Sequence, residues 1–260
     1  ERLDRVVMIY VLTLFFMLVV GGYLFLEWGS NWGSTAEEQG GSMPGDAFFD
    51  EGSSKRLAMT RAVTIQAEPE IVWPWLDQMG RGAGWYSFDW LDNGGKTSAR
   101  HIVSWIPESE LGDASPIGYL RHLLPGQSMA WWLKGLRFAG ATTRLVVDIS
   151  LTRQGDRSRL VIRNSADAAG VMAGMALLIF RFIDSIMAIR QLVGIRNRVE
   201  CFGARTENPE APETGAKDQY QLYETIFASG EWAGKHGKEL AGRWRQTAID
   251  DGVIRSKPPI

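Results

Sequence analysis

Residues 71–93 read IVWPWLDQMGRGAGWYSFDWLDN, and they hold four of the eleven tryptophans of the chain within 23 residues. Aromatic side chains bury the largest area per residue, and a buried tryptophan needs a hydrogen-bond partner for its N–H group. A stretch this rich in aromatic residues therefore lines either a hydrophobic core or an apolar pocket.

The residues around this stretch define a local unit of strand, helix and turn. Val63 and Ile65 alternate with polar neighbours, as in a half-buried strand. The segment 67–70 (AEPE) then begins a helix, because proline and acidic residues favour the first helical turn. The glycines within 80–84 break the helix, and a second short aromatic helix follows.

This unit resembles the beginning of the SRPBCC domains, the START-like, polyketide cyclase-type "helix-grip" superfamily, and we expect a membrane-anchored branch of it. The shared pattern on the first helix is Ala-x-Pro-x-x-Val-Trp-x-x-Leu, which is matched here by Ala67, Pro69, Val72, Trp73 and Leu76. The resemblance spans residues 60–201 and implies an α+β fold, in which a curved antiparallel sheet surrounds a long C-terminal helix. It implies little about activity, because the superfamily includes lipid binders, cyclases and interaction domains.

The rest of this domain follows the same plan. Residues 98–103, 128–134, 142–152 and 159–164 are expected strands, and the last two form an antiparallel hairpin. A long helix is expected over residues 168–201, with Asn164, Ser165 and Asp167 as candidate caps. Its expected buried face is Val171, Met175, Leu178, Phe182, Ile186, Ile189 and Val193; its expected polar face holds Arg181, Asp184, Gln191 and Arg198.

An uncharged apolar segment precedes the domain. Residues 6–26 are 21 residues without a charge, and as a helix they extend about 31 Å, which matches a bilayer core. A cleaved signal peptide is the alternative, but its apolar core is normally about 7–15 residues long. We expect a single-pass anchor, with Arg2 and Arg5 inside and the domain periplasmic or otherwise extracytoplasmic, since no Lys or Arg follows until Lys55.

The chain therefore divides into four segments. Residues 1–28 are the expected transmembrane anchor, 29–58 an extended arm or linker rich in Gly, Ser and acids, 59–203 the SRPBCC-like domain, and 204–260 a helical tail. Phe48 and Phe49 are expected to pin the arm to a surface. The tail has too few apolar residues for a core of its own and needs a surface to pack against.

The sequence offers little catalytic chemistry. The histidines His101, His122 and His236 lack partners at metal-ligand spacing, and one cysteine excludes a multi-cysteine site, so no metal is predicted. No catalytic residue is assigned. Asp77, Asp89 and Asp92 lie among the aromatics, where a carboxylate would have a raised pKa; the simpler interpretation is that they cap helices or bind tryptophan N–H groups.

The candidate binding residues are aromatic. Candidates for a ligand cavity are Trp73, Trp75, Trp85, Tyr86, Trp90, Trp131 and Phe182; candidates for an interface are Trp28, Trp32, Trp232 and Trp244. The alternative for the cavity set is that it only fills the space between sheet and helix. No cofactor is predicted, and a lipid, quinone or pigment is the candidate bound molecule.

The favoured function is a non-catalytic accessory or structural subunit of a larger integral membrane complex, such as a photosynthetic or respiratory one. Its expected partners are the lipid bilayer and other membrane-protein subunits. A formal net charge of −2 argues against nucleic acid as a partner. The alternatives are a stand-alone protein or sensor that binds a hydrophobic lipid or quinone at the membrane, and a cyclase-like enzyme.

Overall fold

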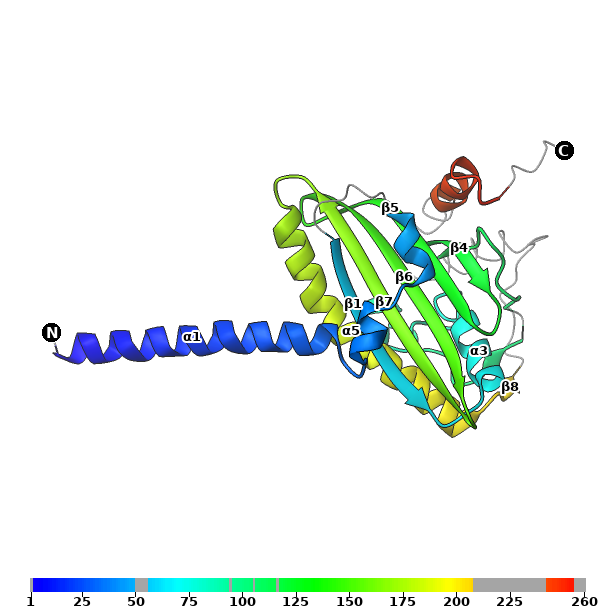
Figure 1. Ribbon diagram of the computed structural model, residues 1–260, viewed down its shortest axis with the longest axis horizontal. Coiled ribbons are helices and arrows are strands. Elements are labelled where there is room, and N and C mark those ends of the chain that lie inside the picture. The colour runs from blue at the N-terminus through cyan, green and yellow to red at the C-terminus, as the bar shows by residue number, and fades with distance from the viewer. Residues whose placement is uncertain are drawn as a thin grey trace.

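A six-stranded antiparallel sheet with the order β1-β7-β6-β5-β4-β3 forms the centre of the body (Figure 1). The computed structural model describes residues 2–49, 56–93, 95–104, 106–115, 117–207 and 242–254. The strands are β1 (Arg56–Ile65), β3 (Ala114–Ser115), β4 (Gly118–Leu124), β5 (Ser128–Phe138), β6 (Ala141–Gln154) and β7 (Arg157–Ala169). A separate parallel pair joins β2 (Ile102–Val103) to β8 (Thr206–Glu207).

Helices flank the sheet and extend beyond it. They are α1 (Arg2–Ser30), α2 (Ala36–Gly40), the 3-10 helix η1 (Pro44–Phe48), α3 (Pro69–Asp77), α4 (Asp89–Asp92) and α5 (Ala173–Phe202), and residues 242–250 are also helical. The long helix α5 packs along one face of the sheet, mainly on β1 and β7. This arrangement confirms the predicted α+β helix-grip fold.

Each face of the sheet carries its own hydrophobic core. The face toward α5 buries alternate residues of the strands, such as Ile65, Ile149 and Ile162, against Trp75 and Leu192. The opposite face carries a smaller core of Phe49, Tyr119, Trp132, Val146, Trp244 and Ala248. The period-two alternation predicted for residues 142–152 is confirmed at Val146, Ile149 and Leu151: Val146 belongs to the smaller core, and Ile149 and Leu151 belong to the larger one.

The end of strand β7 and the buried face of α5 differ from the sequence prediction. Strand β7 continues to Ala169, paired with Thr142, so Asn164, Ser165 and Asp167 are strand residues and not helix caps. The buried residues of α5 are mostly small or aliphatic: Ala176, Ser185, Ala188, Leu192, Gly194, Ile195 and Val199. Phe182 and Ile186, predicted to be buried, are 50% and 41% exposed. Small residues take the buried positions in the first half of α5, and its larger apolar side chains lie outside.

Two strand predictions also need correction. Residues 98–103 form a strand only at Ile102 and Val103. Strand β4 was not predicted, because Arg121 and His122 interrupt the apolar alternation of this seven-residue segment.

Helix α1 is one continuous helix that projects from the body (Figure 1). Residues 4–24 are exposed throughout, whereas Gly29 and Ser30 are buried against the domain. Within the described residues, Asp4–Ser30 is the one helix that is long and apolar enough to cross a membrane, a property shared by anchors and signal sequences.

A three-way joint fastens the end of α1 to β1 and α5. The guanidinium of Arg61 on β1 is fully buried; it donates to the carbonyl of Gly29 and to Asp184 Oδ2, the latter at 2.7 Å. Arg181 of α5 donates to Glu27 Oε1 at 2.7 Å. A Cβ added to Gly29 would lie 2.7 Å from Cβ of Ser185, so the two helices touch where only glycine fits.

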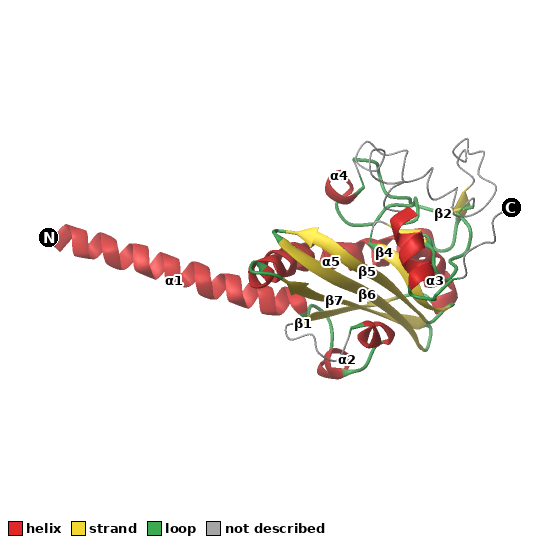
Figure 2. Cartoon of the chain, turned by 90° about the horizontal axis from the view of Figure 1, so that it is seen from above, coloured by secondary structure: helices red, strands yellow, loops and turns green. Residues whose placement is uncertain are grey.

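The arm lies on the sheet face opposite α5 (Figure 2). Arg163 of β7 donates to the carbonyls of Glu38, Gln39 and Gly41, at the C-terminal end of α2. Phe49 packs edge-on against Trp132 at 5.3 Å between ring centroids, which confirms that the phenylalanine pair pins the arm. The arm is therefore packed on the body, although the sequence also allowed a loose linker.

The described part of the tail, residues 242–254, covers the same face. Trp244 is 1% exposed within the small core, and Asp251 accepts a hydrogen bond of 2.6 Å from the hydroxyl of Tyr119. The predicted packing surface for the tail is thus the chain's own sheet.

We expect the two apolar positions of α5 to respond differently to truncation. Leu192→Ala should cost about 2–5 kcal/mol by leaving a cavity in the core. Ile186→Ala should cost well under 1 kcal/mol in detergent, because its side chain is half-exposed. Chemical denaturation of both variants measures the difference; equal costs would contradict the corrected face.

Replacing Gly29 should separate α1 from the body. Gly29→Val forces side-chain atoms onto Ser185 and should cost about 1–3 kcal/mol by overpacking. Gly22→Val is the matched control, because a Cβ there meets nothing within 4 Å. Thermal unfolding of the detergent-solubilised variants tests this, and an equal fall in Tm would show that the contact at Gly29 does not matter.

The buried carboxyl group of Asp148 should make the stability of the fold depend on pH. Burial raises its pKa from 3.8 to about 6; Asp46 adds to the rise, and the hydrogen bond from Gly45 and the charge of Arg163 oppose it. Between these pH values the folded chain keeps a proton that the unfolded chain has lost, so stability should fall as pH rises from about 4 to 6. Asp148→Asn should flatten this decline by about 3 kcal/mol. An unchanged slope in denaturation series at several pH values would contradict the assignment.

Candidate functional site

The aromatic stretch folds as predicted into a helix, a glycine-broken turn and a second short helix. Gly80, Gly82 and Gly84 all have positive φ angles, which other residues rarely adopt. Tyr86 also has a positive φ of 61°, and its backbone carbonyl would lie 2.0 Å from a Cβ at Gly194 of α5. The turn is therefore pressed directly onto the helix backbone.

Polar contacts fix the turn in this position. Gln78 donates to the hydroxyl of Tyr86 at 2.8 Å, and the guanidinium of Arg198 lies 4.7 Å from the centre of the same ring. The Nε1 group of Trp75 donates to the carbonyl of Gly203 at 2.9 Å. These contacts hold the aromatic unit beside α5 and leave a space next to it.

That space, the α5 cleft, lies between α5, the sheet and the aromatic unit, and its volume is about 430 Å³. A volume of this size suits a small apolar molecule. The lining residues are Met79, Trp85, Ser87, Trp90, Leu91, Asp92, Ile117, Leu145, Val147, Asn164, Phe180, Ile183, Asp184, Met187, Ala188 and Gln191. Trp90 and Leu91, at 74% and 52% exposed, form its rim.

Polar side chains in the cleft connect to the Arg61 joint. Asn164 of β7 donates to Asp184 Oδ1 at 2.7 Å, and Asp184 Oδ2 accepts from Arg61. The amide orientation of Asn164 is fixed by this contact, which directs its Oδ1 away from Asp184. Among the described residues, the buried Oδ1 atoms of Asn164 and Asp92 have no hydrogen-bond partner. A ligand group that donates a hydrogen bond would satisfy them.

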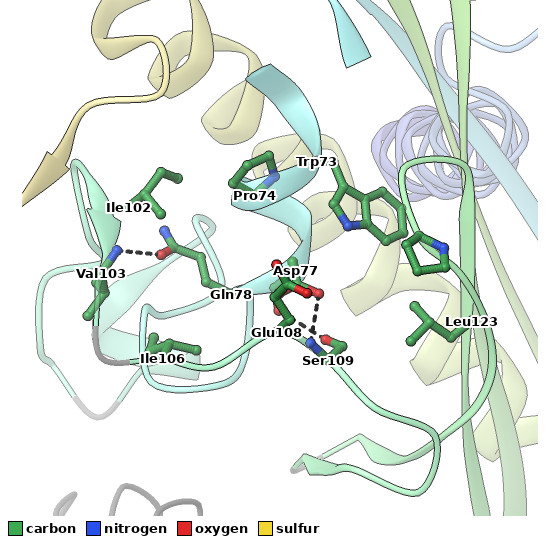
Figure 3. A pocket seen from close by; sticks show the side chains of 11 residues that line it. Trp73, Pro74, Asp77, Gln78, Ile102, Val103, Ile106, Glu108, Ser109 and Leu123 are labelled. Atoms are coloured by element: carbon green, nitrogen blue, oxygen red, sulfur yellow. Dashed lines mark hydrogen bonds between the residues drawn. The ribbon is translucent and has the colours of Figure 1, made fainter. Parts of the chain in front are cut away.

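A second pocket of about 310 Å³ lies beside α3 (Figure 3). Asp77 faces Ser109, whose backbone N–H donates to it at 3.2 Å, and Gln78 accepts from the N–H of Val103 at 2.8 Å. Trp73 and Leu123 close another side of the pocket. The side chains of Asp77 and Gln78 in this pocket therefore hold the backbone at Ser109 and Val103 in place.

A buried ion cluster lies behind this second pocket. Arg81 is fully buried and forms ion pairs of 3.2 Å with both Asp77 and Asp113. Burial raises the pKa of Asp113 to about 6, and the charge of Arg81 opposes the rise. The cluster braces the 107–113 loop against the end of α3, since Arg81 also donates to the carbonyl of Pro107 at 2.8 Å. The α5 cleft is therefore the stronger candidate for ligand binding.

The predicted cavity residues lie in the α5 cleft, in the second pocket, in the core and on the outside of α5. Trp85 and Trp90 line the α5 cleft, and Trp73 lines the second pocket. Three others are core residues without contact to either space: Trp75, Tyr86 and Trp131. Phe182 lies outside the cleft and packs on Phe25 of α1, with 5.6 Å between ring centroids.

The predicted interface residues also differ in their surroundings. Trp28 is 56% exposed at the end of α1. Trp32 is partly buried against the main core, so it contacts the domain. Trp244 is buried in the chain's own sheet, which contradicts its prediction as an exposed anchor for a partner. Trp232 lies outside the described residues.

The acidic residues mainly hold backbone groups. Asp89 accepts from the N–H of Ser98 at 3.1 Å, and Asp92 accepts from the N–H of Phe88 at 3.3 Å. This confirms a structural role for both, although they bind loop amides and not tryptophan N–H groups. Burial raises the pKa of Asp92, which lines the α5 cleft. Within the described residues, no group of three or more His, Cys, Asp or Glu could hold a metal.

Asn164 and Asp184 were not predicted as cleft residues. Asn164 follows Leu160 and Ile162 in the alternation of β7, and a polar residue on the apolar side of a strand was the available signal. Asp184 gave no such signal, because the apolar face of α5 was assigned to the wrong side.

No family model and no curated protein matches the chain. Among solved structures it is similar to a conserved protein from Geobacillus kaustophilus, with 12% identity over 55% of this chain and 95% of that one and a TM-score of 0.36. It is also similar to an AHSA1-like protein from Rhizobium etli, with 15% identity over 65% and 96% and a TM-score of 0.33. A third similar structure is NdmB of Pseudomonas putida CBB5, with 13% identity over 79% of this chain and 57% of that one and a TM-score of 0.35. Likenesses at this level carry no argument about activity, and membership of a membrane-anchored SRPBCC branch stays a prediction.

Proposed function

We propose that this chain is a membrane-anchored helix-grip protein that holds an apolar molecule with a hydrogen-bond donor in the α5 cleft. The observation that carries the proposal is the mainly apolar cleft of about 430 Å³ with the unpartnered Oδ1 atoms of Asn164 and Asp92. Burying such acceptors without partners costs about 1–3 kcal/mol each, which a bound hydroxyl or amide N–H would recover. A long-chain alcohol, a quinol or a lipid with a hydroxyl group has this chemistry.

The anchor part of the proposal is supported by the continuity of α1. The apolar span leads without a break into Gly29 and Ser30, which are buried in the body. Loss of the span would thus remove a helix whose last turn belongs to the domain. The extracytoplasmic side of the body remains the expectation from the Lys and Arg asymmetry.

The role is proposed to be non-catalytic binding, but one observation favours a cyclase-like enzyme as the second candidate. Asp92 lines the cleft with a raised pKa, as a general acid or base would. Its bond to the N–H of Phe88 is a structural use for the same carboxylate. Recovery of the bound molecule chemically unchanged after long incubation supports a binder; conversion that Asp92→Asn abolishes supports the enzyme.

The accessory-subunit role stays a prediction, and the packing of the arm and the tail gives it less support than the sequence alone did. The arm and residues 242–254, which suggested missing partners, pack on the chain's own sheet. Co-purification of other membrane subunits with the chain in mild detergent would support the accessory-subunit role.

Photolabelling with a long-chain alcohol that carries a diazirine tests the proposal in vesicles. Labels should reach Met79, Trp85 or Val147 in the cleft, as well as α1, whose labelling reports bilayer exposure. Ala188→Phe fills the cleft and should reduce cleft labelling about tenfold or more, equal to about 1.4 kcal/mol. Ala58→Phe, at an exposed strand residue, is the matched control.

Two results would contradict the proposal. Cleft residues that stay unlabelled while α1 is labelled would show that the cleft does not take the alcohol. Equal labelling of the cleft in Ala188→Phe and the wild-type chain would place the alcohol elsewhere.

A further inference from the structure

The first half of α5 carries a row of exposed apolar side chains, which we call the α5 stripe. Its residues are Met175, Leu178, Ile179, Phe182, Ile183 and Ile186, each between 37% and 50% exposed. The spacing of three and four residues places them on a single helix face. Val171 and Met172, at 102% and 45% exposed, extend the stripe to the start of the helix.

The stripe begins where α1 leaves the body. Phe182 contacts Phe25 of α1, and the adjacent Arg181 is paired with Glu27. Both views show the first half of α5 at the end of the body from which α1 projects (Figures 1 and 2). If α1 spans a bilayer, the stripe therefore lies at the level where the span ends.

The stripe also reaches the α5 cleft on its other side. Ile183 belongs both to the stripe and to the cleft lining. Trp90 and Leu91 continue the exposed apolar surface along the cleft rim. Tryptophan prefers the membrane interface, and Trp28 and Trp90 are exposed near the two sides of the stripe.

A contiguous apolar face of this kind is unfavourable in water, at roughly 25 cal/mol for each Å² exposed. The stripe contains no charged residue, and the neighbouring Arg181 is neutralised by Glu27. A helix with such a face lies in the plane of the membrane interface, with its apolar side among the acyl chains. The continuity with α1 makes lipid the occupant that fits this surface.

We propose that the α5 stripe lies in the headgroup–acyl boundary of the bilayer, so that the body is attached to the membrane both by α1 and by α5. This inference rests on the proposed anchor. The mouth of the α5 cleft then faces lipid at Ile183, Trp90 and Leu91, and an apolar ligand passes between bilayer and cleft without crossing water. A second copy of the chain or another subunit on the stripe is the competing outcome.

Nitroxide labels at single cysteines measure this depth in the full chain. In a Cys201→Ser background, labels are placed at Leu178 and Ile186 of the stripe, at Leu14 on α1, and at Asp156 in the β6–β7 turn, where the side chain is 91% exposed. The purified variants are reconstituted at low density in phosphatidylcholine vesicles, and collisions with oxygen and with a water-soluble nickel chelate are compared.

The ratio of oxygen to nickel collisions should be highest at residue 14, clearly raised at residues 178 and 186, and low at residue 156. Water-like ratios at 178 and 186 with a high ratio at 14 would overturn the inference while the anchor stands. A water-like ratio at 14 would overturn the anchor itself. Protection of 178 and 186 from both reagents that disappears on dilution with lipid would assign the stripe to a second copy and also overturn the inference.

Discussion

The buried charge of Arg61 is the constraint on which the arrangement of anchor, sheet and helix depends. A fully buried guanidinium must be paired, and Arg61 meets this need with Asp184 of α5 and the carbonyl of Gly29 in α1. Removing one partner of such a pair typically costs about 3–5 kcal/mol, so the joint tolerates little rearrangement. Because Asp184 also holds Asn164, the same charge determines how the polar end of the α5 cleft is presented.

The placement of α5 against the sheet and the aromatic turn accounts for both the cleft and the exposed stripe. Ala188 and Gly194 face inward, and the turn at Tyr86 rests on the helix backbone at Gly194. Larger apolar residues in the first half of α5, such as Phe182 and Ile186, lie outside. The apolar α5 cleft and the exposed α5 stripe are therefore neighbours. Both lie next to the end of α1, a helix long and apolar enough to span a bilayer.

The fold could be predicted because the aromatic unit carries the residues of the SRPBCC resemblance, and because the other signals are local and periodic. The aromatic unit, the hairpin at residues 142–164 and the apolar segment 6–26 were recognisable from residue type and spacing alone. The buried side of α5 could not be predicted, because large residues normally face the core and here alanine, serine and glycine do. The roles of Arg61, Asp184 and Asn164 depend on contacts between residues up to 123 positions apart, which no local pattern contains.

Residues that looked unpartnered in the sequence mostly found partners within the chain. Trp244 and Phe49 belong with Trp132 to the small core on the sheet face opposite α5, and Arg163 holds the arm. In the cleft, the buried Oδ1 atoms of Asn164 and Asp92 still lack partners among the described residues. Native mass spectrometry of the chain released from its own membrane tests this view most directly. We expect one apolar molecule that remains bound at collision energies that remove the lipids around α1; a chain that appears only at its bare mass would contradict the account.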